Sequence, residues 1–213
     1  MVESATVGAG SLAGNGVYAA RDFDAGEVVV TYELRPVDED GYVALPVGED
    51  LFVHSYGGRR YLYPAPARFV NHADDPSCYQ DFDRYCDIAR RPIARGEPIT
   101  IDAGQETAHE LGTFLDAYRS ALAESDGPAL GALVDGDVVR WAQGREIRGR
   151  DAVVAELLDH PPGSWSKTEW LVGTGRWEAL CSAEIDDAGG RRHLTMLLKV
   201  ITGNWQIVYQ HAG

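Results

Sequence analysis

The chain has no apolar run long enough to cross a membrane, which takes about 20 consecutive apolar residues in a helix. Its first ten residues, MVESATVGAG, lack the basic and apolar regions of a signal peptide. We therefore expect a cytoplasmic protein that does not bind membranes.

Cysteine is also scarce. The three cysteines, Cys78, Cys86 and Cys181, are too few for a disulfide framework, and none forms the C-x-x-C spacing of a zinc site. The sequence therefore predicts neither a disulfide-stapled fold nor a metal centre.

Basic residues are in the minority, with 19 Lys and Arg against 33 Asp and Glu and a net charge of -14. Residues 1–106 carry nine basic and 18 acidic side chains, and residues 107–213 carry ten and 15. Neither half offers the positive surface that phosphate backbones require, so we expect no nucleic-acid partner. The acidity suits a basic peptide or a cationic small molecule, although solubility alone would also favour it.

What is present is typical of a globular protein. The 213 residues are 45% hydrophobic and 24% charged, and this length suits one large or two small domains. The composition becomes helical from Gln105 onward, so we place a domain boundary near Glu106.

The most informative stretch is Arg68–Cys78, RFVNHADDPSC. An apolar pair, Phe69 and Val70, leads into Asn71 and His72, and a proline then fixes the polar loop that follows. Asn and His side chains both donate and accept hydrogen bonds, which suits the edge of a heterocycle. From this chemistry alone, a turn with a satisfied histidine is the more common interpretation.

Two flanking stretches extend the pattern. Upstream, the chain reads GNGVYAA over 14–20 and DAGEVVVTYE over 24–33, and downstream it reads ARRPIARGEPITID over 89–102. In order and spacing, these blocks and the central one resemble the SET domain, the fold of many protein-lysine methyltransferases. The central block is similar to the family's R-F-I-N-H-S-C-x-P-N-C motif, and the downstream block to its A-x-x-x-I-x-x-G-E-E-L-T-x-D-Y motif.

The resemblance implies that residues 1–106 form a SET-like domain of short strands that binds S-adenosylmethionine. The cofactor-binding residues that it implies are Asn15, Gly16, Val17, Tyr18, Arg68, Phe69, Asn71 and His72. It also makes Tyr32 the candidate catalytic residue, because some family members place an active-site tyrosine at this position. A tyrosine that only closes a strand is the structural alternative.

Two departures from the family pattern bear on the reaction. Ala103 follows Asp102 where the family usually has a tyrosine, and Ser77 stands where the motif often has asparagine. Alanine cannot orient an amine through its side chain, so that task would pass to Tyr32 and to a tyrosine of the 34–67 insert. We predict short strands separated by turns for this insert.

The second half follows a different pattern. Residues 111, 114, 115, 118 and 122 are apolar or aromatic and share one face of a helix, and residues 150–159 form another helix. Strands are predicted over 137–141, 170–178, 179–185, 192–201 and 205–211. The stretches FLDAYRSALAESD, DVVRW, GRDAVVAELL and WQIVYQH resemble the NTF2-like superfamily, which implies an α+β cone over 107–213. The predicted fold class is therefore mainly β plus α+β.

Whether the cone has a site of its own stays open at this stage. The titratable candidates for such a site are Asp116, Asp137, His193 and His211, and surface or structural roles are the simpler interpretation of each. Cones of this kind often associate through their sheets, so we expect a homodimer.

Three functions fit the sequence. The first is an S-adenosylmethionine-dependent methyltransferase that acts on a lysine-containing peptide or on another amine, including a small cationic molecule. The second is an S-adenosylmethionine-binding SET fold used in small-molecule biosynthesis, with the NTF2-like domain closing the pocket. The third is a non-catalytic binding or dimerisation protein. The resemblance to a family of enzymes favours the first.

Overall fold

The computed structural model describes residues 4–10, 14–187 and 190–213. Contacts divide the chain into two compact units, which we describe separately. Unit 1 comprises Met1–His54 and Tyr61–Glu110, and unit 2 comprises Ser55–Arg60 and Leu111–Gly213. The later division falls inside a helix, so the boundary expected near Glu106 stays a prediction.

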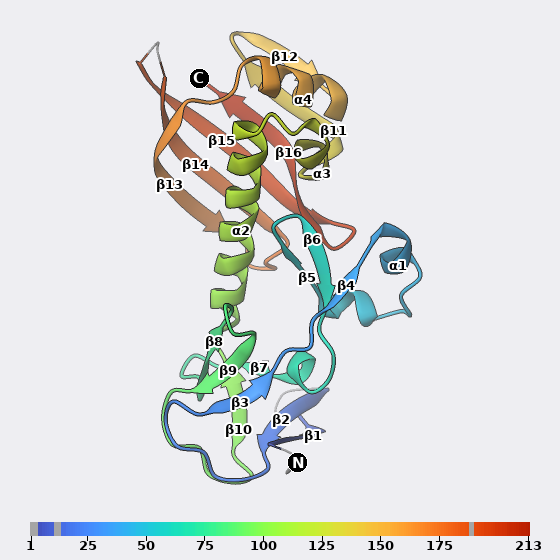
Figure 1. Cartoon of the computed structure of the whole chain (residues 1–213), viewed down its shortest axis with the longest axis vertical. Coiled ribbons are helices and arrows are strands. Elements are labelled where there is room, and N and C mark those ends of the chain that lie inside the picture. The colour runs from blue at the N-terminus through green and yellow to red at the C-terminus, as the bar shows by residue number, and fades with distance from the viewer. Residues whose placement is uncertain (1–3, 11–13, 188–189) are drawn as a thin grey trace. The chain divides into compact units, whose positions relative to one another are not determined.

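Unit 1 is built mainly from short strands (Figure 1). They are β1 (Ala5–Ala9), β2 (Asn15–Ala19), β3 (Val28–Thr31), β4 (Arg35–Val37), β5 (Val53–Tyr56), β6 (Arg59–Leu62), β7 (Asn71–His72), β8 (Cys78–Asp81), β9 (Cys86–Ala89) and β10 (Pro98–Ile101). The tip of the β5–β6 hairpin, Ser55–Arg60, belongs to unit 2. β8 and β9 form an antiparallel hairpin, with Cys78 in register with Ala89 and Asp81 with Cys86.

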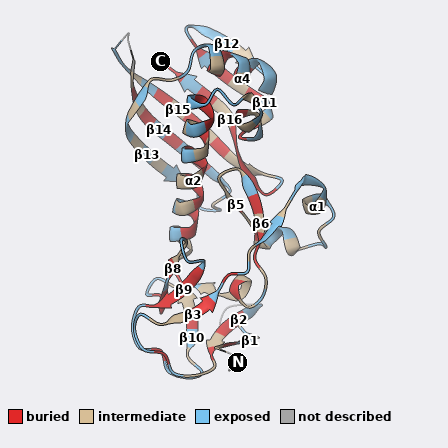
Figure 2. Ribbon diagram, in the orientation of Figure 1, coloured by how far each residue is buried: buried red, intermediate tan, exposed pale blue. Residues whose placement is uncertain are grey.

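The strands form three small sheets, with the orders β1-β2-β10-β7, β3-β9-β8 and β4-β6-β5. Within the first sheet, β10 pairs with β2 in the antiparallel sense and with β7 in the parallel sense. Apolar side chains from several of these short strands make the core, in which β9 and the middle of β3 are buried (Figure 2). The largest buried aliphatic residues here are Ile88, Ile93 and Ile99.

The 34–67 insert differs from the all-strand prediction. It contains a short helix, α1 (Glu39–Val43), and a 3-10 turn, η1 (Glu49–Phe52), and a second such turn, η2 (Ala67–Phe69), begins at its end. The Asp38 side chain caps α1 by accepting a hydrogen bond of 2.8 Å from the Gly41 amide. Two acidic residues in the first turn add favourable charge at this helix end.

Unit 2 is a six-stranded sheet with helices on one face (Figure 1). The strand order is β12-β11-β16-β15-β14-β13. The strands are β11 (Val134–Ala142), β12 (Arg145–Arg148), β13 (Ser164–Val172), β14 (Glu178–Asp187), β15 (Gly190–Ile201) and β16 (Asn204–Ala212). The helices are α2 (Ala103–Ala123), α3 (Gly127–Ala132) and α4 (Arg150–Asp159), the first of which starts in unit 1.

The predicted apolar face of the long helix is confirmed. Leu111, Phe114, Leu115, Tyr118 and Leu122 are all at most 9% exposed and belong to one core with residues of the sheet. Because these positions recur with the helical period, one side of α2 is buried and the other remains polar. No helix in the described residues has the length and apolarity needed to cross a membrane.

One strand prediction in unit 2 is wrong. The sequence suggested a strand over 170–178, but β13 covers Ser164–Val172 and a turn follows it. Within that turn the Arg176 amide donates to the Gly173 carbonyl over 2.9 Å, and Arg176 has a φ of 58°. The two glycines at 173 and 175 interrupt the strand, as glycine commonly does.

The tip of the β5–β6 hairpin is tied to the end of the sheet within unit 2. The Ser55 hydroxyl donates to Asn204 Oδ1 over 3.0 Å, and the Arg60 Nη2 atom donates to Thr202 Oγ1 over 3.0 Å. Arg60 also donates through Nε to the Thr202 carbonyl. These bonds fix the tip against the turn between β15 and β16.

Candidate functional site

Each of the three blocks of the sequence motif contributes one strand to the same sheet of unit 1. Strand β10 lies between β2, which follows the glycine turn, and β7, which is the Asn-His pair. Thr100 is in register with Asn71, and Ile101 with His72. On the other edge, Ile99 is in register with Val17. The downstream block therefore joins the two blocks that the resemblance assigns to cofactor binding.

A side-chain hydrogen bond connects those two blocks directly. The amide nitrogen Nδ2 of Asn71 donates to the carbonyl oxygen of Asn15 over 3.2 Å. Gly16 leaves the space that this contact needs, because a Cβ atom there would lie 3.2 Å from Asn71 Nδ2 and 3.3 Å from the Cα of Gly10. The glycine at 16 thus serves a close approach of backbone and side chain.

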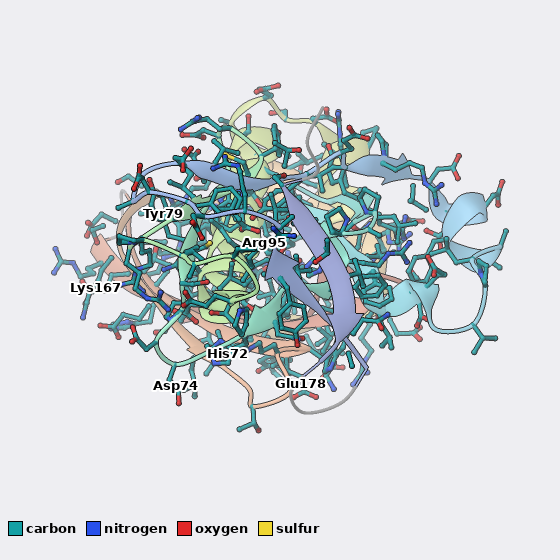
Figure 3. All side chains as sticks on the ribbon, turned by 90° about the horizontal axis from the view of Figure 1, so that it is seen from below. His72, Asp74, Tyr79, Arg95, Lys167 and Glu178 are labelled. Atoms are coloured by element: carbon teal, nitrogen blue, oxygen red, sulfur yellow. The ribbon has the colours of Figure 1, made fainter. Side chains whose placement is uncertain are left out.

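His72 contacts the start of the long helix. Its Nδ1 atom accepts a hydrogen bond of 3.3 Å from the Ala103 amide and lies 3.7 Å from Asp102 Oδ1. Its Nε2 atom lies 3.6 Å from Asp74 Oδ1, and Figure 3 labels both side chains. The ring is therefore held between the loop after β7 and the end of β10.

The position of the missing family tyrosine is now clear. Ala103 is the first residue of α2, and its amide is one of the donors that have no acceptor within the helix, so it bonds to His72 instead. Asp102 satisfies others, since its Oδ1 accepts from the Gly104 amide over 2.9 Å and its carbonyl accepts from Gln105. The chain thus turns into a helix where the family motif continues with an aromatic side chain.

The other predicted cofactor residues lie in different surroundings. The Val17 side chain is 1% exposed and is part of the core, and the Tyr18 hydroxyl donates to the Ala9 carbonyl over 2.5 Å. Arg68 pairs with Glu49 at 2.6 Å and lies over the rings of Phe52 and Phe69. The structure therefore brings Asn15, Gly16, Asn71 and His72 together, while Arg68 and Phe69 form a cluster with the 34–67 insert.

Tyr32, the candidate catalytic residue, is 8% exposed, and its hydroxyl donates to Asp87 Oδ1. Its ring centroid lies 5.2 Å from that of Tyr63. Burial and the charge of Asp87 raise the pKa of Tyr32. Burial also raises the pKa of Asp87 to about 7, against the opposing effect of the hydrogen bond from Tyr32. A catalytic role for Tyr32 stays a prediction, and the structure adds Asp87 as its partner.

Sequence reasoning missed a second polar group in unit 1. His54 Nδ1 lies 3.3 Å from Glu110 Oε1 and 3.5 Å from Glu106 Oε1, and its ring contacts Tyr63. Burial by itself lowers the pKa of His54, but the bond to Glu110 and the charges of both glutamates outweigh it, so the pKa is raised. The spacing of the glutamates, four residues apart on one helix face, was the available signal.

No group of three or more His, Cys, Asp or Glu side chains in the described residues is arranged to hold a metal ion. The candidate site is instead a set of backbone groups and polar side chains around Asn71 and His72, with buried polar pairs elsewhere in the same unit. Such a set can hold a polar organic cofactor through directed hydrogen bonds.

Residues 14–104 match the family model of the SET domain, so this part of the chain is similar to that family. SET domains are generally found in methyltransferases, which makes a methyltransferase-type function the one that the family suggests.

Several solved structures are similar to about half of the chain. One is a candidate histone methyltransferase of Plasmodium falciparum, with 16% identity over 48% of this chain and 94% of its own, and a TM-score of 0.39. Another is an NTF2-like protein of unknown function from Silicibacter pomeroyi, with 24% identity over 52% and 97%, and a TM-score of 0.40. A DUF3225 family protein of unknown function from Pectobacterium atrosepticum shows 21% identity over 50% and 89%, and a TM-score of 0.44.

No curated protein shows significant similarity to the chain.

Proposed function

We propose that unit 1 binds S-adenosylmethionine and transfers its methyl group to an amine, either a lysine of a basic peptide or a small cationic molecule. The observation that carries the proposal is the hydrogen bond from Asn71 to the Asn15 carbonyl. It joins the glycine turn and the Asn-His strand, which are the two blocks that family members use for the cofactor. The match of residues 14–104 to the SET domain supports the same function.

The residues present fit such a cofactor. The space beside Gly16 would be filled by a Cβ atom, and it lies against the polar side chain of Asn71. Asn71 keeps a carbonyl oxygen for hydrogen bonding after its nitrogen is used, and the half-exposed ring of His72 lies beside it in β7, with Nε2 near Asp74. These groups would hold the cofactor, and the backbone of the glycine turn would hold its amino-acid end. When bound, S-adenosylmethionine supplies a methyl group activated by a sulfonium.

Methyl transfer is an in-line displacement in which the amine lone pair forms the new N–C bond as the S–C bond breaks. The chain must therefore align the amine, keep it neutral and exclude water. Acidic side chains near the site would attract a cationic amine and accept the proton that it loses. We propose Tyr32, with its hydroxyl fixed on Asp87, as the aromatic group that helps in this alignment.

A second candidate function follows from Ala103. Because this residue begins α2, no side-chain hydroxyl stands where the family usually places one. Losing one orienting hydroxyl costs on the order of ten- to a thousandfold in rate in comparable sites. The second candidate is therefore an S-adenosylmethionine-binding SET fold that serves small-molecule chemistry other than N-methylation.

Isothermal titration calorimetry of the full chain with S-adenosylmethionine tests the shared part of both candidates. Asn71→Asp replaces the donor by a carboxylate facing the Asn15 carbonyl, so we expect binding to weaken about tenfold or more. The matched control is Arg95→Gln, which changes an exposed side chain (Figure 3) and should bind as the unaltered chain does. An unaltered chain that releases no heat and shows no binding would contradict both candidates.

Transfer of a radiolabelled methyl group separates the two. Label from methyl-labelled S-adenosylmethionine should appear in a lysine-rich peptide or a small polyamine, and Asn71→Asp should abolish it. Binding without label in either acceptor would favour the second candidate. The thermal unfolding of Asn71→Asp has to match that of the unaltered chain, so that a loss of label can be assigned to the site.

A further inference from the structure

Unit 2 contains a groove between the end of α2 and the start of β13, which the SET-type function does not use. The volume of this α2–β13 groove is about 580 Å³. Its lining residues are Arg119, Leu122 and Ala123 of α2, Ser125 in the turn after that helix, residues 161–163, and Trp165 of β13. None of them belongs to the four central strands of the sheet, β11, β16, β15 and β14, so the groove lies on the flank of the unit. The titratable residues that the sequence suggested for this unit, at 116, 137, 193 and 211, do not line it.

The groove contains a cation without a counter-charge. Arg119 is the only charged residue on this lining, and no described carboxylate pairs with it. By contrast, Arg140 of the same unit pairs with Glu156 at 2.5 Å. Arg119 donates through Nη2 to Thr168 Oγ1 over 3.2 Å, whereas its Nε is buried without a hydrogen-bond partner among the described residues. A buried donor without an acceptor is costly, so Arg119 offers an anion both a charge and an unused donor.

An aromatic ring holds the guanidinium of Arg119 in place. Its central carbon lies 4.7 Å from the ring centroid of Trp165, which is the geometry of a cation–π contact. The Trp165 ring in turn meets the buried ring of Tyr118 at a steep angle, with the centroids 6.1 Å apart. Because the indole covers one face of the guanidinium, a planar carboxylate that accepts hydrogen bonds along the edge is the anion that fits best.

The rest of the lining is mainly apolar and is open to solvent. Leu122 and the proline pair at 161 and 162 join Trp165 on the lining, and Ser125 and Pro161 are exposed. Sites for small molecules usually enclose about 70–90% of the ligand surface, which an open groove does not do. The groove instead suits the end of a longer chain, with its last side chain on the apolar lining and the remainder outside.

The chain next to the lining residues is acidic. Glu124 and Asp126 flank Ser125 in the sequence, Asp159 precedes Pro161 by two residues, and all three acidic side chains are exposed. The lining itself carries a cation and no acid. This arrangement is complementary to one carboxylate inside the groove and basic side chains outside it. A peptide with several carboxylates would be repelled by the acidic rim.

We propose that the α2–β13 groove binds the carboxyl terminus of a basic peptide or protein. The terminal carboxylate accepts hydrogen bonds from Arg119, the last side chain packs on Trp165 and the proline pair, and basic residues further back face Glu124 and Asp126. Capture of a terminal carboxylate is a recurring mode of peptide recognition. The proposed site lies entirely within unit 2, so it stands or falls independently of S-adenosylmethionine binding by unit 1.

The probe is the fluorescein-labelled hexapeptide KKRSGL with a free carboxyl terminus, and the matched control is the same peptide with a carboxyl-terminal amide. Binding to the full chain is measured by fluorescence anisotropy. We expect the free acid to bind about tenfold or more tightly than the amide, because only the acid forms charged hydrogen bonds with a guanidinium. The peptide EEESGL, also a free acid, should bind more weakly than KKRSGL. Unlabelled N-acetyl-leucine distinguishes a small acid from a peptide end and should compete poorly.

Two variants assign the carboxylate contact. Arg119→Gln should weaken binding of the free acid about ten- to a hundredfold and leave the amide almost unaffected. Arg119→Lys keeps the charge but loses the planar fork, so it should give an intermediate loss. The matched control is Arg145→Gln, which makes the same change of charge at an exposed position of β12 that does not line the groove. This control should bind the free acid as the unaltered chain does.

If Arg119→Gln does not fold, the comparison of the free acid with the amide on the unaltered chain carries the test. The proposal is overturned if neither peptide binds or if the acid and the amide bind equally well. It is also overturned if Arg119→Gln and Arg145→Gln weaken binding to the same extent. Competition by N-acetyl-leucine as strong as that by unlabelled KKRSGL would make a small acid the occupant and would overturn it too.

Discussion

Tyr32 and Asp87 form a buried pair in which the tyrosine hydroxyl donates to the carboxylate oxygen Oδ1. The other oxygen of Asp87, Oδ2, and the amide oxygen of Gln80 are buried without hydrogen-bond partners among the described residues. Gln80 and Asp87 are directly opposite each other on β8 and β9, a register that places their side chains on one face. A proton on Asp87 would turn its carboxyl group into a donor on the face that carries this second acceptor.

The first prediction concerns pH. Burial raises the pKa of Asp87 from an ordinary 3.8 to about 7, so the folded chain binds the proton more tightly than the unfolded chain does. Between these values the folded state holds the extra proton, and stability therefore falls as pH rises through this window. The loss at Asp87 is on the order of 4 kcal/mol when the window is complete. Asp87→Asn cannot titrate and should lack this loss.

The measurement is urea unfolding of both proteins from about pH 3 to pH 8, which brackets the two pKa values. The free energy of unfolding of Asp87→Asn should exceed that of the unaltered chain at the high end of the range and approach it at the low end. Parallel pH profiles for the two proteins would mean that Asp87 is already ionised in the folded state.

The second prediction concerns Gly16. In Gly16→Ala, the added Cβ must push Asn71 or the backbone at Gly10 away by a few tenths of an ångström. We expect S-adenosylmethionine binding to fall about tenfold and stability to drop by about 1 kcal/mol. The control is Gly112→Ala within α2, where a Cβ would meet no atom within 4 Å. Because alanine favours helices, this control should gain about 0.5 to 1 kcal/mol, with binding unchanged.

The third prediction concerns the hairpin tip. Arg60→Ala removes the bonds to Thr202 and should destabilise unit 2 by about 1 to 3 kcal/mol. Arg59→Ala, at the exposed neighbouring position, should change stability by less than about 0.5 kcal/mol. Hydrogen exchange of the β15 and β16 amides reports the effect locally. Equal protection in the two variants would show that the tip is not needed for the sheet.

The fourth prediction concerns self-association, which we propose occurs through the β13–β14 edge. Leu171 and Leu180 are opposite each other there and are 70% and 36% exposed, and Trp177 in the adjoining turn is 52% exposed. Large apolar side chains exposed at one edge of a sheet favour contact with another copy. Light scattering should give the mass of a dimer for the unaltered chain and of a monomer for Leu171→Glu. Lys167→Glu, on the same strand, should remain dimeric.

Much of the architecture follows from the sequence, because periodic burial leaves a clear signal. The helical repeat from Leu111 to Leu122 predicted the buried face of α2, and the alternation of apolar residues predicted most strands of the second half. The Asn71 and Gly16 blocks were also found, and the structure brings them within one hydrogen bond. These are local patterns whose meaning does not depend on distant parts of the chain.

The polar networks were not predictable in the same way. Asp87 pairs with Tyr32 across 55 residues, and Arg140 meets Gln210 across 70. The residues around either partner do not indicate the other one. A single sequence does not show which distant charged residues come together in the fold. Glu156 is an exception, because its position did carry a local signal that the sequence analysis missed. It lies three residues after buried Val153, on the apolar side of α4. An acidic residue on a buried helix face is a reason to look for a partner.

The segment Ser55–Arg60 completes a unit whose other residues begin some fifty positions later. The second half of the chain therefore does not contain all the residues of unit 2. A fragment cut at the midpoint of the sequence would contain the six-stranded sheet without the hairpin tip that hydrogen-bonds to its β15–β16 turn. The first half alone would keep the hairpin tip, but Ser55 and Arg60 would lose their partners Asn204 and Thr202.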